Sequence, residues 1–376
     1  MINTKFFYDK LVELGIDFFT GVPDSLLKDI CSYITDVTPR DKNVIAANEG
    51  GAVGLAIGYT MATSKIPFVY MQNSGFGNTI NPLLSIADPK VYGIPMLLMV
   101  GWRGEPNVKD EPQHIKQGEV SEDLLRVLNI PYAIISSNTL NIDSVLQEAI
   151  EVMTKKNTPF VLLVKKGTFE PYKLINEEQT YYDLNREGAI KKVIDLINED
   201  DIVVSTTGKT SREVFEYREE KGDGHSKDFL TVGGMGHANQ IALGIALAKP
   251  KRTVYCFDGD GAVLMHTGSM GIIGDLAPAN LKHIIFNNGA HDSVGGQPTI
   301  GFKINFEKIA QGFNYKETFK IENIADFDIV FDSFKKASGP CLLEILINKG
   351  ARKNLGRPTI SPQQNKNSFM KRIQRK

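Results

Sequence analysis

The sequence contains few cysteines and no long apolar run. Its three cysteines, Cys31, Cys256 and Cys341, lie far apart and form no Cys-x-x-Cys pair. This usage argues against a disulfide framework and against a zinc knuckle, and it suits a reducing compartment. No apolar stretch approaches the roughly 18 residues that a membrane-spanning helix needs. The N-terminal residues do not resemble a secretion signal. We therefore expect a cytoplasmic protein with no membrane partner.

The sequence also lacks an excess of one charge. Its 43 basic and 44 acidic residues give a formal net charge of −1 over 376 residues. Nucleic acid is therefore not expected as a general partner. Hydrophobic residues make up 42% and charged residues 23% of the chain, which excludes a mainly disordered protein. At roughly 100–200 residues per domain, the length fits two domains.

Short apolar runs alternate with helical patterns along the chain. The strands predicted from these runs are 16–20, 44–47, 67–71, 96–100, 132–135, 160–164, 202–205, 229–232, 253–257, 284–286 and 342–347. Continuous apolar strands between helices are typical of parallel sheets covered on both faces. We predict the α/β class, with two doubly wound parallel-sheet domains.

A polar stretch at 168–185 interrupts this alternation and indicates a linker near residue 175. The predicted domains are therefore residues 1–175 and 186–348. The remaining tail, 349–376, has nine basic and no acidic residues. Two readings of this tail stay open: a solvated surface segment, or a basic cover over the active site.

The motif with the clearest chemistry is Gly259-Asp260-Gly261, after the predicted strand 253–257. Twenty-five residues separate it from Asn287-Asn288, which follows the predicted strand 284–286. In a parallel sheet both motifs lie at the carboxyl ends of strands, where ligands of open α/β sheets bind. The glycines let a diphosphate approach the backbone, and the oxygens of Asp260 and Asn288 suit Mg²⁺ or Ca²⁺.

These two motifs at this spacing resemble the cofactor and metal motif of the thiamine diphosphate-dependent 2-oxo acid decarboxylase superfamily. The resemblance implies a pyrimidine-binding domain at 1–175 and a diphosphate- and metal-binding domain at 186–348, with no central third domain. It also implies thiamine diphosphate and Mg²⁺ as cofactors. The metal ligands would be Asp260, the Asn288 side chain and the backbone carbonyl of Ala290.

The superfamily carries a glutamate after a strand of the first domain, at the start of a helix. Glu49, in Asn48-Glu49-Gly50-Gly51, matches this position. In the resembled enzymes this carboxyl group bonds the cofactor's aminopyrimidine ring and promotes its activation. Without the metal motif, the simpler interpretation of Glu49 is an acidic residue favoured at a helix N-terminus by the helix dipole.

A third feature is Gly233-Gly234-Met235-Gly236, in which Met235 matches the bulky residue that props the bent cofactor in this superfamily. A core methionine and a weak dinucleotide fingerprint are the alternatives. The residues expected to bind the cofactor are Glu49, Gly208, Lys209, Thr210, Gly234, Met235, Gly259, Asp260, Gly261, Ala262 and Asn288.

Several segments resemble one family, the phosphonopyruvate decarboxylases, over nearly the whole chain. They are 21–28, 71–75, 101–106, 110–114, 205–213, 291–299 and 355–358. The resemblance implies non-oxidative decarboxylation of 3-phosphonopyruvate to phosphonoacetaldehyde and CO₂, in the biosynthesis of phosphonates such as 2-aminoethylphosphonate. A fused sulfopyruvate decarboxylase is the second reading, although that family usually splits the two domains between chains. The third hypothesis is a thiamine diphosphate-binding protein without activity. The fourth is a nicotinamide-dependent dehydrogenase.

A substrate with a carboxylate and a phosphonate needs cationic or hydrogen-bonding groups. The candidate substrate-binding residues are Arg357, Arg103, Lys109, Ser293, Gln297 and Thr299, with Arg357 the preferred phosphonate ligand. The candidate catalytic residues, apart from Glu49, are Asp24, His114 and His291. Asp24 can also be read as a helix cap.

The resembled enzymes bind the cofactor between the pyrimidine domain of one subunit and the diphosphate domain of another. Glu49 and Asp260 fall in different predicted domains. We therefore expect a homodimer or a higher homo-oligomer with active sites at the subunit interface. The other expected partner is a small 2-oxo acid that carries a phosphonate.

Overall fold

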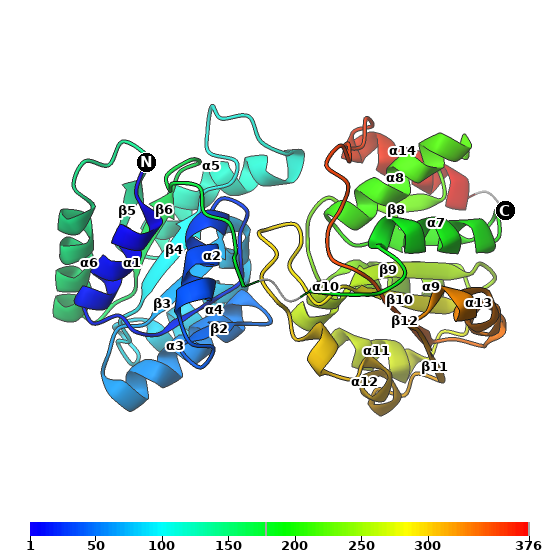
Figure 1. The fold of residues 1–376 in the computed structure, drawn as a ribbon, viewed down its shortest axis with the longest axis horizontal. Helices are drawn as coiled ribbons and strands as arrows, with labels where there is room; N and C mark the ends of the chain where they lie inside the picture. The colour runs from blue at the N-terminus through cyan, green and yellow to red at the C-terminus, as the bar shows by residue number, and fades with distance from the viewer. Residues whose placement is uncertain (177–178, 375–376) are drawn as a thin grey trace. The chain divides into compact units, whose positions relative to one another are not determined.

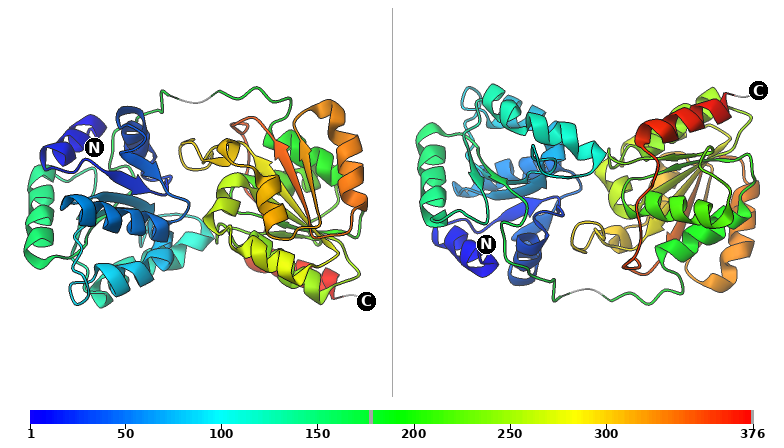
Figure 2. Two further views of the ribbon diagram at one scale, coloured as in Figure 1. Left: turned by 90° about the horizontal axis from the view of Figure 1, so that it is seen from below. Right: turned by 90° about the horizontal axis from the view of Figure 1, so that it is seen from above.

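The computed structural model describes residues 1–176 and 179–374. The chain divides into two compact units, which we describe separately. Unit 1 comprises Met1–Glu177 with His291–Pro298, and unit 2 comprises Glu178–Ala290 with Thr299–Lys376. Each unit contains a six-stranded sheet with all strands parallel and with helices on its faces (Figure 1 and Figure 2). The predicted fold class, two doubly wound α/β domains without a third domain between them, is confirmed for the described residues.

The sheet of unit 1 has the strand order β2-β1-β3-β4-β6-β5. Its strands are β1 Phe19–Gly21, β2 Asn43–Ile45, β3 Phe68–Gln72, β4 Leu97–Gly101, β5 Tyr132–Ile135 and β6 Phe160–Val164. Its α-helices are α1 Thr4–Glu13, α2 Lys28–Val37, α3 Glu49–Thr63, α4 Phe76–Pro82, α5 Pro112–Val127 and α6 Ile142–Lys156. A 3₁₀ turn, η1 Asn73–Gly75, precedes α4, and a π-helical turn, η2 Leu83–Ala87, follows it.

Alternate residues of each strand pack on opposite faces of this sheet. In β3, Phe68 and Tyr70 join a core with α1, α2 and α6, whereas Val69 and Met71 join a core with α3, α4 and α5. All four side chains are buried. This two-sided burial explains why the strands read as continuous apolar runs in the sequence.

The sheet of unit 2 has the strand order β11-β12-β10-β9-β7-β8. Its strands are β7 Ile202–Ser205, β8 Asp228–Leu230, β9 Val254–Gly259, β10 Leu281–Asn287, β11 Glu317–Ile321 and β12 Cys341–Leu346. Its α-helices are α7 Arg186–Leu196, α8 Lys209–Lys221, α9 Ala238–Ala248, α10 Asp260–Met265, α11 Ser269–Leu276, α12 Phe306–Gly312, α13 Phe327–Lys336 and α14 Pro362–Ile373. Two 3₁₀ turns, η3 Gly301–Lys303 and η4 Ile324–Asp326, complete the unit.

The helices of unit 2 also form two layers. Helices α7, α8 and α13 pack on one face of the sheet, and α9, α10, α11, α12 and α14 contribute to the core on the other. Strands β9, β10 and β12 are adjacent in the sheet. The carboxyl ends of β9 and β10 carry the two parts of the predicted metal motif.

Strand β11 is the one element of either sheet that the sequence did not predict. It forms an edge of the sheet of unit 2 and, within the described part of the chain, pairs only with β12. Four of its five residues are exposed or half-buried. An edge strand of mixed polarity lacks the continuous apolar run by which the inner strands were recognised.

The basic tail folds against unit 2. Helix α14 begins with a capping box at Ser361 and lies along β8 (Figure 1). The Asn365 amide donates to the backbone carbonyl of Asp228 at 2.9 Å, and its oxygen accepts the N–H of Leu230 at 3.2 Å. Phe369 is buried in the same core. That the tail covers the active site stays a prediction.

Within the described residues, no helix combines the length and the apolar character that crossing a bilayer requires.

Candidate active site

Glu49 is the first residue of α3, as the sequence predicts. Asn48 caps the helix, because its Oδ1 accepts the N–H of Gly51 at 2.8 Å. The Glu49 side chain is buried, and its Oε2 accepts a 2.7 Å hydrogen bond from the side-chain amide of Asn78 in α4. A Cβ at Gly75 would lie 2.6 Å from Cγ of Glu49, so this approach requires glycine. The carboxyl group is thus held between Asn78 and the backbone at Gly75.

Asp24 lies in the turn after β1 and is fully buried. Its Oδ2 accepts the N–H of Leu26 at 3.0 Å, whereas Oδ1 has no hydrogen-bond partner among the described residues. Burial raises the pKa of this carboxyl to about 6, although the charge of Arg103 opposes the shift. At Gly101, the last residue of β4, a Cβ would lie 2.1 Å from Oδ2 of Asp24. A carboxyl group with this pKa can both give and accept a proton near neutral pH.

Arg103, a predicted substrate ligand, is bound by groups of its own unit. Its Nε donates to Asp110 at 2.8 Å, its Nη2 donates to the same carboxylate at 2.5 Å, and its Nη1 donates to Oγ of Ser25 at 2.7 Å. Asp110 also accepts the N–H of Gly104 at 2.8 Å. Burial, the largest single effect, would lower the pKa of the guanidinium, but the hydrogen bond to Asp110 and the negative charges of Asp110 and Asp24 together raise the pKa. Arg103 therefore supplies a fixed positive charge.

His114 lies in the first turn of α5 and is buried. Its Nδ1 has no hydrogen-bond partner among the described residues. Burial, assisted by the charge of Arg103, lowers the pKa of this imidazole to about 4. His114 is therefore neutral at pH 7. Arg103 acts electrostatically on both Asp24 and His114, so the structure brings these three predicted residues into one cluster of unit 1.

Asp260 begins α10 directly after β9 and is buried. Thr299 donates a short hydrogen bond to its Oδ2, and the backbone N–H groups of Asn288 and Gly261 also stabilise the carboxylate. Burial nevertheless raises the pKa of Asp260 to about 6. The two parts of the predicted metal motif thus meet in the fold of unit 2.

Asn288 and Ala290 lie in the turn after β10. Oδ1 of Asn288 accepts the N–H of Ala290 at 3.1 Å, and both residues are buried. Between them, Gly289 has a φ of 62°, in the left-handed region. A Cβ at Gly289 would also lie 2.4 Å from the Phe302 ring, so both its conformation and its surroundings require glycine.

The donor set would suit a divalent metal. Asp260, Asn288 and the carbonyl of Ala290 offer oxygen atoms, which are the ligands that Mg²⁺ prefers. Within the described residues, Asp260 accepts hydrogen bonds but forms no ion pair, so a bound cation would supply the missing positive charge. A Cβ at Gly301 would lie 2.5 Å from Oδ2 of Asp260, so no side chain can occupy that approach.

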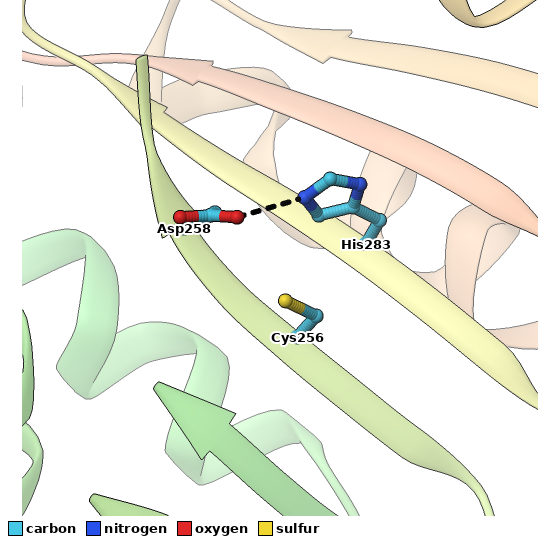
Figure 3. Close-up of side chains that lie close together, drawn as sticks. All are labelled: Cys256, Asp258 and His283. Atoms are coloured by element: carbon cyan, nitrogen blue, oxygen red, sulfur yellow. Dashed lines mark ion pairs between the residues drawn. The ribbon is translucent and has the colours of Figure 1, made fainter. Parts of the chain in front are cut away.

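Three buried side chains on the same sheet form a second polar cluster (Figure 3). Cys256 and Asp258 of β9 and His283 of β10 offer ligand-type atoms within 4.8 Å of one another. Nε2 of His283 lies 3.4 Å from Oδ2 of Asp258, and its Nδ1 lies 3.2 Å from the Tyr315 hydroxyl. Oδ1 of Asp258 accepts the N–H of Gly259 at 3.2 Å. Oδ2 of Asp258 and Nε2 of His283 have no hydrogen-bond partner among the described residues, and the two side chains lie on the adjacent strands that carry the metal motif.

The other predicted cofactor residues lie in loops of unit 2. Gly208, Lys209 and Thr210 lie where α8 begins, and Gly208 has a φ of 93°. Gly234 and Met235 lie in the loop before α9, where Met235 is half-buried. Gly259 ends β9, and Gly261 and Ala262 are buried in α10. Their contacts with the cofactor stay a prediction.

The loop after the metal motif is divided between the units. His291–Pro298 groups with unit 1, whereas Thr299 groups with unit 2 and contacts Asp260. Burial lowers the pKa of His291 to about 4. The Gln297 side chain is fully buried, with its Nε2 3.4 Å from Oγ of Ser32 and with no partner for Oε1 among the described residues. Ser293 is exposed.

The two remaining predicted cations, Lys109 and Arg357, are exposed, Lys109 in unit 1 and Arg357 in unit 2. Arg352, nearby in the tail, forms ion pairs with Glu187 and Glu216. The glutamate contacts fix this part of the tail on α7 and α8. Phosphonate binding by Arg357 and Lys109 stays a prediction.

The sequence did not indicate two of the asparagines that organise unit 1. Asn78 bonds Glu49, and Asn73 bonds the backbone of Arg103 through both its amide nitrogen (2.8 Å) and its oxygen (3.2 Å). Asn73 lies within the segment 71–75 that resembles the family. The resemblance therefore marked this segment, but it did not indicate that Asn73 bonds Arg103. Asn78 carries no such signal, because only the tertiary fold brings it to Glu49.

The described geometry agrees with the comparisons to known proteins. The family model "Thiamine pyrophosphate enzyme, N-terminal TPP binding domain" matches residues 3–125, and "Thiamine pyrophosphate enzyme, C-terminal TPP binding domain" matches residues 206–345. Thiamine pyrophosphate is another name for thiamine diphosphate. The fold and the two matches define a thiamine pyrophosphate enzyme whose two cofactor-binding domains are joined in one chain.

Curated relatives narrow this class. A phosphonopyruvate decarboxylase of Streptomyces viridochromogenes is 30% identical over 94% of this chain and 90% of its own length. A phosphonopyruvate decarboxylase of Streptomyces hygroscopicus is 30% identical over 96% of this chain and 92% of its own length. A sulfopyruvate decarboxylase of Methanosarcina acetivorans is 26% identical over 91% of each chain. The chain belongs to the phosphonopyruvate decarboxylase family of thiamine pyrophosphate-dependent decarboxylases.

Proposed function

We propose that the protein decarboxylates 3-phosphonopyruvate to phosphonoacetaldehyde and CO₂ without oxidation, in the biosynthesis of phosphonates. The bond between the carboxylate and the keto carbon breaks, CO₂ leaves, and a proton takes its place. The observation that carries this proposal is the 30% identity to two phosphonopyruvate decarboxylases over nearly the whole chain. The buried acid Glu49 and the oxygen ligands of unit 2 support it, because they supply the groups that such a cofactor needs.

Mg²⁺ is the proposed metal, held by Asp260, Asn288 and the carbonyl of Ala290. When bound, thiamine diphosphate supplies the carbon nucleophile and the electron sink for the bond that breaks. The glycines at 259 and 261 leave the backbone open to its diphosphate. Thr299 holds one oxygen of Asp260 and thereby fixes the orientation of the proposed ligand.

Glu49 would hold a proton on its carboxyl group at a ring nitrogen of the cofactor's pyrimidine. Asn78 fixes the direction of this carboxyl group through Oε2 and leaves Oε1 for that contact. A buried, oriented acid is suited to proton exchange with a bound ring. Glu49 is accordingly the proposed cofactor-activating residue.

Asp24 and His114 are the proposed proton-transfer groups for the substrate. Asp24, with a pKa of about 6, is available in both protonation states near neutral pH. His114 is neutral at pH 7 and exposes no positive charge that would retain the substrate's carboxylate. This matters because the carboxylate must lose its charge as CO₂ leaves.

Sulfopyruvate is the second candidate substrate. The sulfopyruvate decarboxylase of Methanosarcina acetivorans aligns with 91% of this chain in a single polypeptide. Joined domains therefore do not by themselves favour the phosphonate. A phosphonate dianion carries one more negative charge than a sulfonate, although both groups offer three oxygen acceptors. Both substrates would use the same cofactor residues.

A homodimer with active sites at the subunit interface is the proposed assembly. In unit 1, α3 exposes Leu55 and Met61, and a Cβ at Gly54 or Gly58 would meet no atom within 4 Å. In unit 2, Ile272 of α11 is also exposed. Exposed apolar helix surfaces of this kind favour association with a second copy.

Phosphorus-31 NMR tests the reaction directly. With thiamine diphosphate and Mg²⁺ present, we expect the phosphonopyruvate signal to be replaced by that of phosphonoacetaldehyde, and we expect no conversion when either cofactor is omitted. An unchanged substrate signal in the complete mixture would contradict the proposal. Cofactor binding without turnover, measured by calorimetry in the same mixture, would instead favour a binding protein without activity.

A further inference from the structure

Glu344 is a buried carboxylate in the middle of β12. It is 4% exposed, and burial raises its pKa. Its Oε1 accepts a 2.7 Å hydrogen bond from Nδ2 of Asn287, which is also buried. A carboxylate in a sheet core is costly unless it is paired. The hydrogen bond from Asn287 therefore helps to offset the cost of burying Glu344.

Asn287 is the last residue of β10 and is 0% exposed. Its Nδ2 donates to Glu344 and also to the backbone carbonyl of Gly301, at 2.9 Å. Its Oδ1 accepts the N–H of Gly289, at 3.1 Å. Both amide hydrogens and the amide oxygen are thus used, so the side chain has one orientation.

The two backbone partners of Asn287 belong to the two segments that form the proposed metal site. Gly289 lies between Asn288 and Ala290, the proposed ligands on one side. Gly301 follows Thr299, which donates to Asp260, and the Gly301 N–H donates to the Thr299 hydroxyl at 3.0 Å. Asn287 therefore links the turn after β10 to the segment that holds Asp260.

Strand pairing explains why Glu344 can reach this position. In the parallel register of β10 and β12, Glu344 lies beside Ile285, so its side chain shares a face of the sheet with Asn287. Asp258 of β9, which also lies beside Ile285, and His283 of β10 have their side chains on the same face. Glu344 holds the end of β10 from the side opposite to β9.

We propose that Glu344 is a positioning residue for the metal ligands, acting through Asn287. This inference rests on the proposed cofactor site. Without the Glu344 acceptor, one amide hydrogen of Asn287 is left unpaired in the core, which favours rotation of the amide. Rotation would release the N–H of Gly289 or the carbonyl of Gly301. The ligands Asn288 and Asp260 would then no longer be held in the geometry that binds the metal.

Metal binding is the measurement that tests this role, with Mn²⁺ as an electron paramagnetic resonance probe and thiamine diphosphate present. We expect Glu344→Met, which keeps the length but removes the acceptor, to weaken Mn²⁺ binding about tenfold or more. Glu344→Gln keeps an acceptor oxygen and should stay within about threefold of the wild type. Asp201→Asn is the control and should not change Mn²⁺ binding, because this buried carboxylate directly precedes β7, at the amino ends of the strands, whereas the metal motif lies at their carboxyl ends.

A double-mutant cycle with Asn287→Ala tests whether Glu344 affects metal binding through Asn287. If Glu344 acts through Asn287, the double variant binds Mn²⁺ no more weakly than Asn287→Ala alone. Additive losses would overturn the proposal, as would a wild-type dissociation constant in Glu344→Met or a Glu344→Gln variant as weak as Glu344→Met. Should Glu344→Met not fold, Glu344→Leu repeats the test. Failure of the wild type itself to bind Mn²⁺ with thiamine diphosphate would overturn the proposed cofactor site as well.

Discussion

The side-chain amide of Asn78 donates a 2.7 Å hydrogen bond to the buried carboxylate of Glu49. The two residues come from different helices, α4 and α3, and Gly75 packs closely against the Glu49 side chain. The acid that activates the cofactor in this account therefore has a fixed direction before any ligand binds. Preorganisation of this kind reduces the reorganisation needed at the moment of reaction.

Replacing Asn78 tests whether this orientation matters. Asn78→Ala should lower kcat/KM for phosphonopyruvate by about tenfold to a hundredfold, because loss of a buried hydrogen-bond partner costs roughly 1–3 kcal/mol. The measurement is steady-state aldehyde production at saturating thiamine diphosphate. Asn81→Ala, at an exposed position of the same helix, is the matched control and should retain wild-type activity. Equal activity of the two variants would contradict a role of Asn78 in orienting Glu49 for catalysis.

Gly101 leaves room for Asp24. A Cβ there would lie 2.1 Å from Oδ2 of Asp24, so Gly101→Ala must move the buried carboxyl group or the end of β4. We expect a loss of roughly 1–3 kcal/mol in the free energy of unfolding, together with reduced activity. Gly312→Ala places a methyl group where no atom lies within 4 Å and is the control. Urea unfolding compares the two, and equal stability would contradict the packing described at Asp24.

The raised pKa of Asp24 predicts a pH dependence of stability. The folded state keeps the carboxyl proton up to about pH 6, whereas the unfolded chain releases it near 3.8. Between these values the folded state binds more protons, so the free energy of unfolding falls as pH rises. The loss amounts to about 3 kcal/mol at most.

Asp24→Asn should abolish that contribution, because the amide does not titrate. The free energy of unfolding of the wild type, relative to that of Asp24→Asn, should therefore fall from pH 4 to pH 6 and stay constant above pH 6. Urea unfolding at intervals of half a pH unit measures it. Subtracting the variant cancels the other titrating groups, including Asp260. A difference that stays constant over this range would show that Asp24 has an ordinary pKa.

Mixed oligomers test whether each site uses two subunits. Glu49→Gln and Asp260→Ala should each be inactive alone. If sites form between subunits, a dimer that contains one of each variant has one intact site, so co-expression should restore about a quarter of the wild-type activity. Glu49→Gln combined with Glu49→Ala is the control and should restore none. No recovery in heterodimers isolated by two affinity tags would place both residues of a site in the same chain.

The sequence predicted most of the fold because its strands are buried on both faces. Strands such as Phe160–Val164 read as uninterrupted apolar runs and appear where they were expected. The edge strand Glu317–Ile321 was missed, since most of its side chains are not buried. Glycine and acid motifs marked the strand ends correctly: α3 begins at Glu49 and α10 at Asp260.

The sequence was less informative about the partners of the site residues. Arg103 carries a charge suited to a substrate anion, but nothing in the sequence indicated that it pairs with Asp110 and Ser25. Glu344 reads as one polar residue in an apolar strand, and only the register with β10 brings it to Asn287. Such contacts join segments that are far apart in sequence and depend on the completed fold.

The preference of the enzyme for phosphonopyruvate or sulfopyruvate decides between the two candidate substrates. Aldehyde release should be measured from phosphonopyruvate and from sulfopyruvate at several concentrations, with thiamine diphosphate and Mg²⁺, for wild type and for Glu49→Gln. We expect a large kcat/KM preference for phosphonopyruvate in the wild type and loss of turnover in Glu49→Gln, with both proteins folded alike. Turnover of sulfopyruvate alone would contradict the proposed substrate, and full activity of Glu49→Gln would contradict the proposed mechanism.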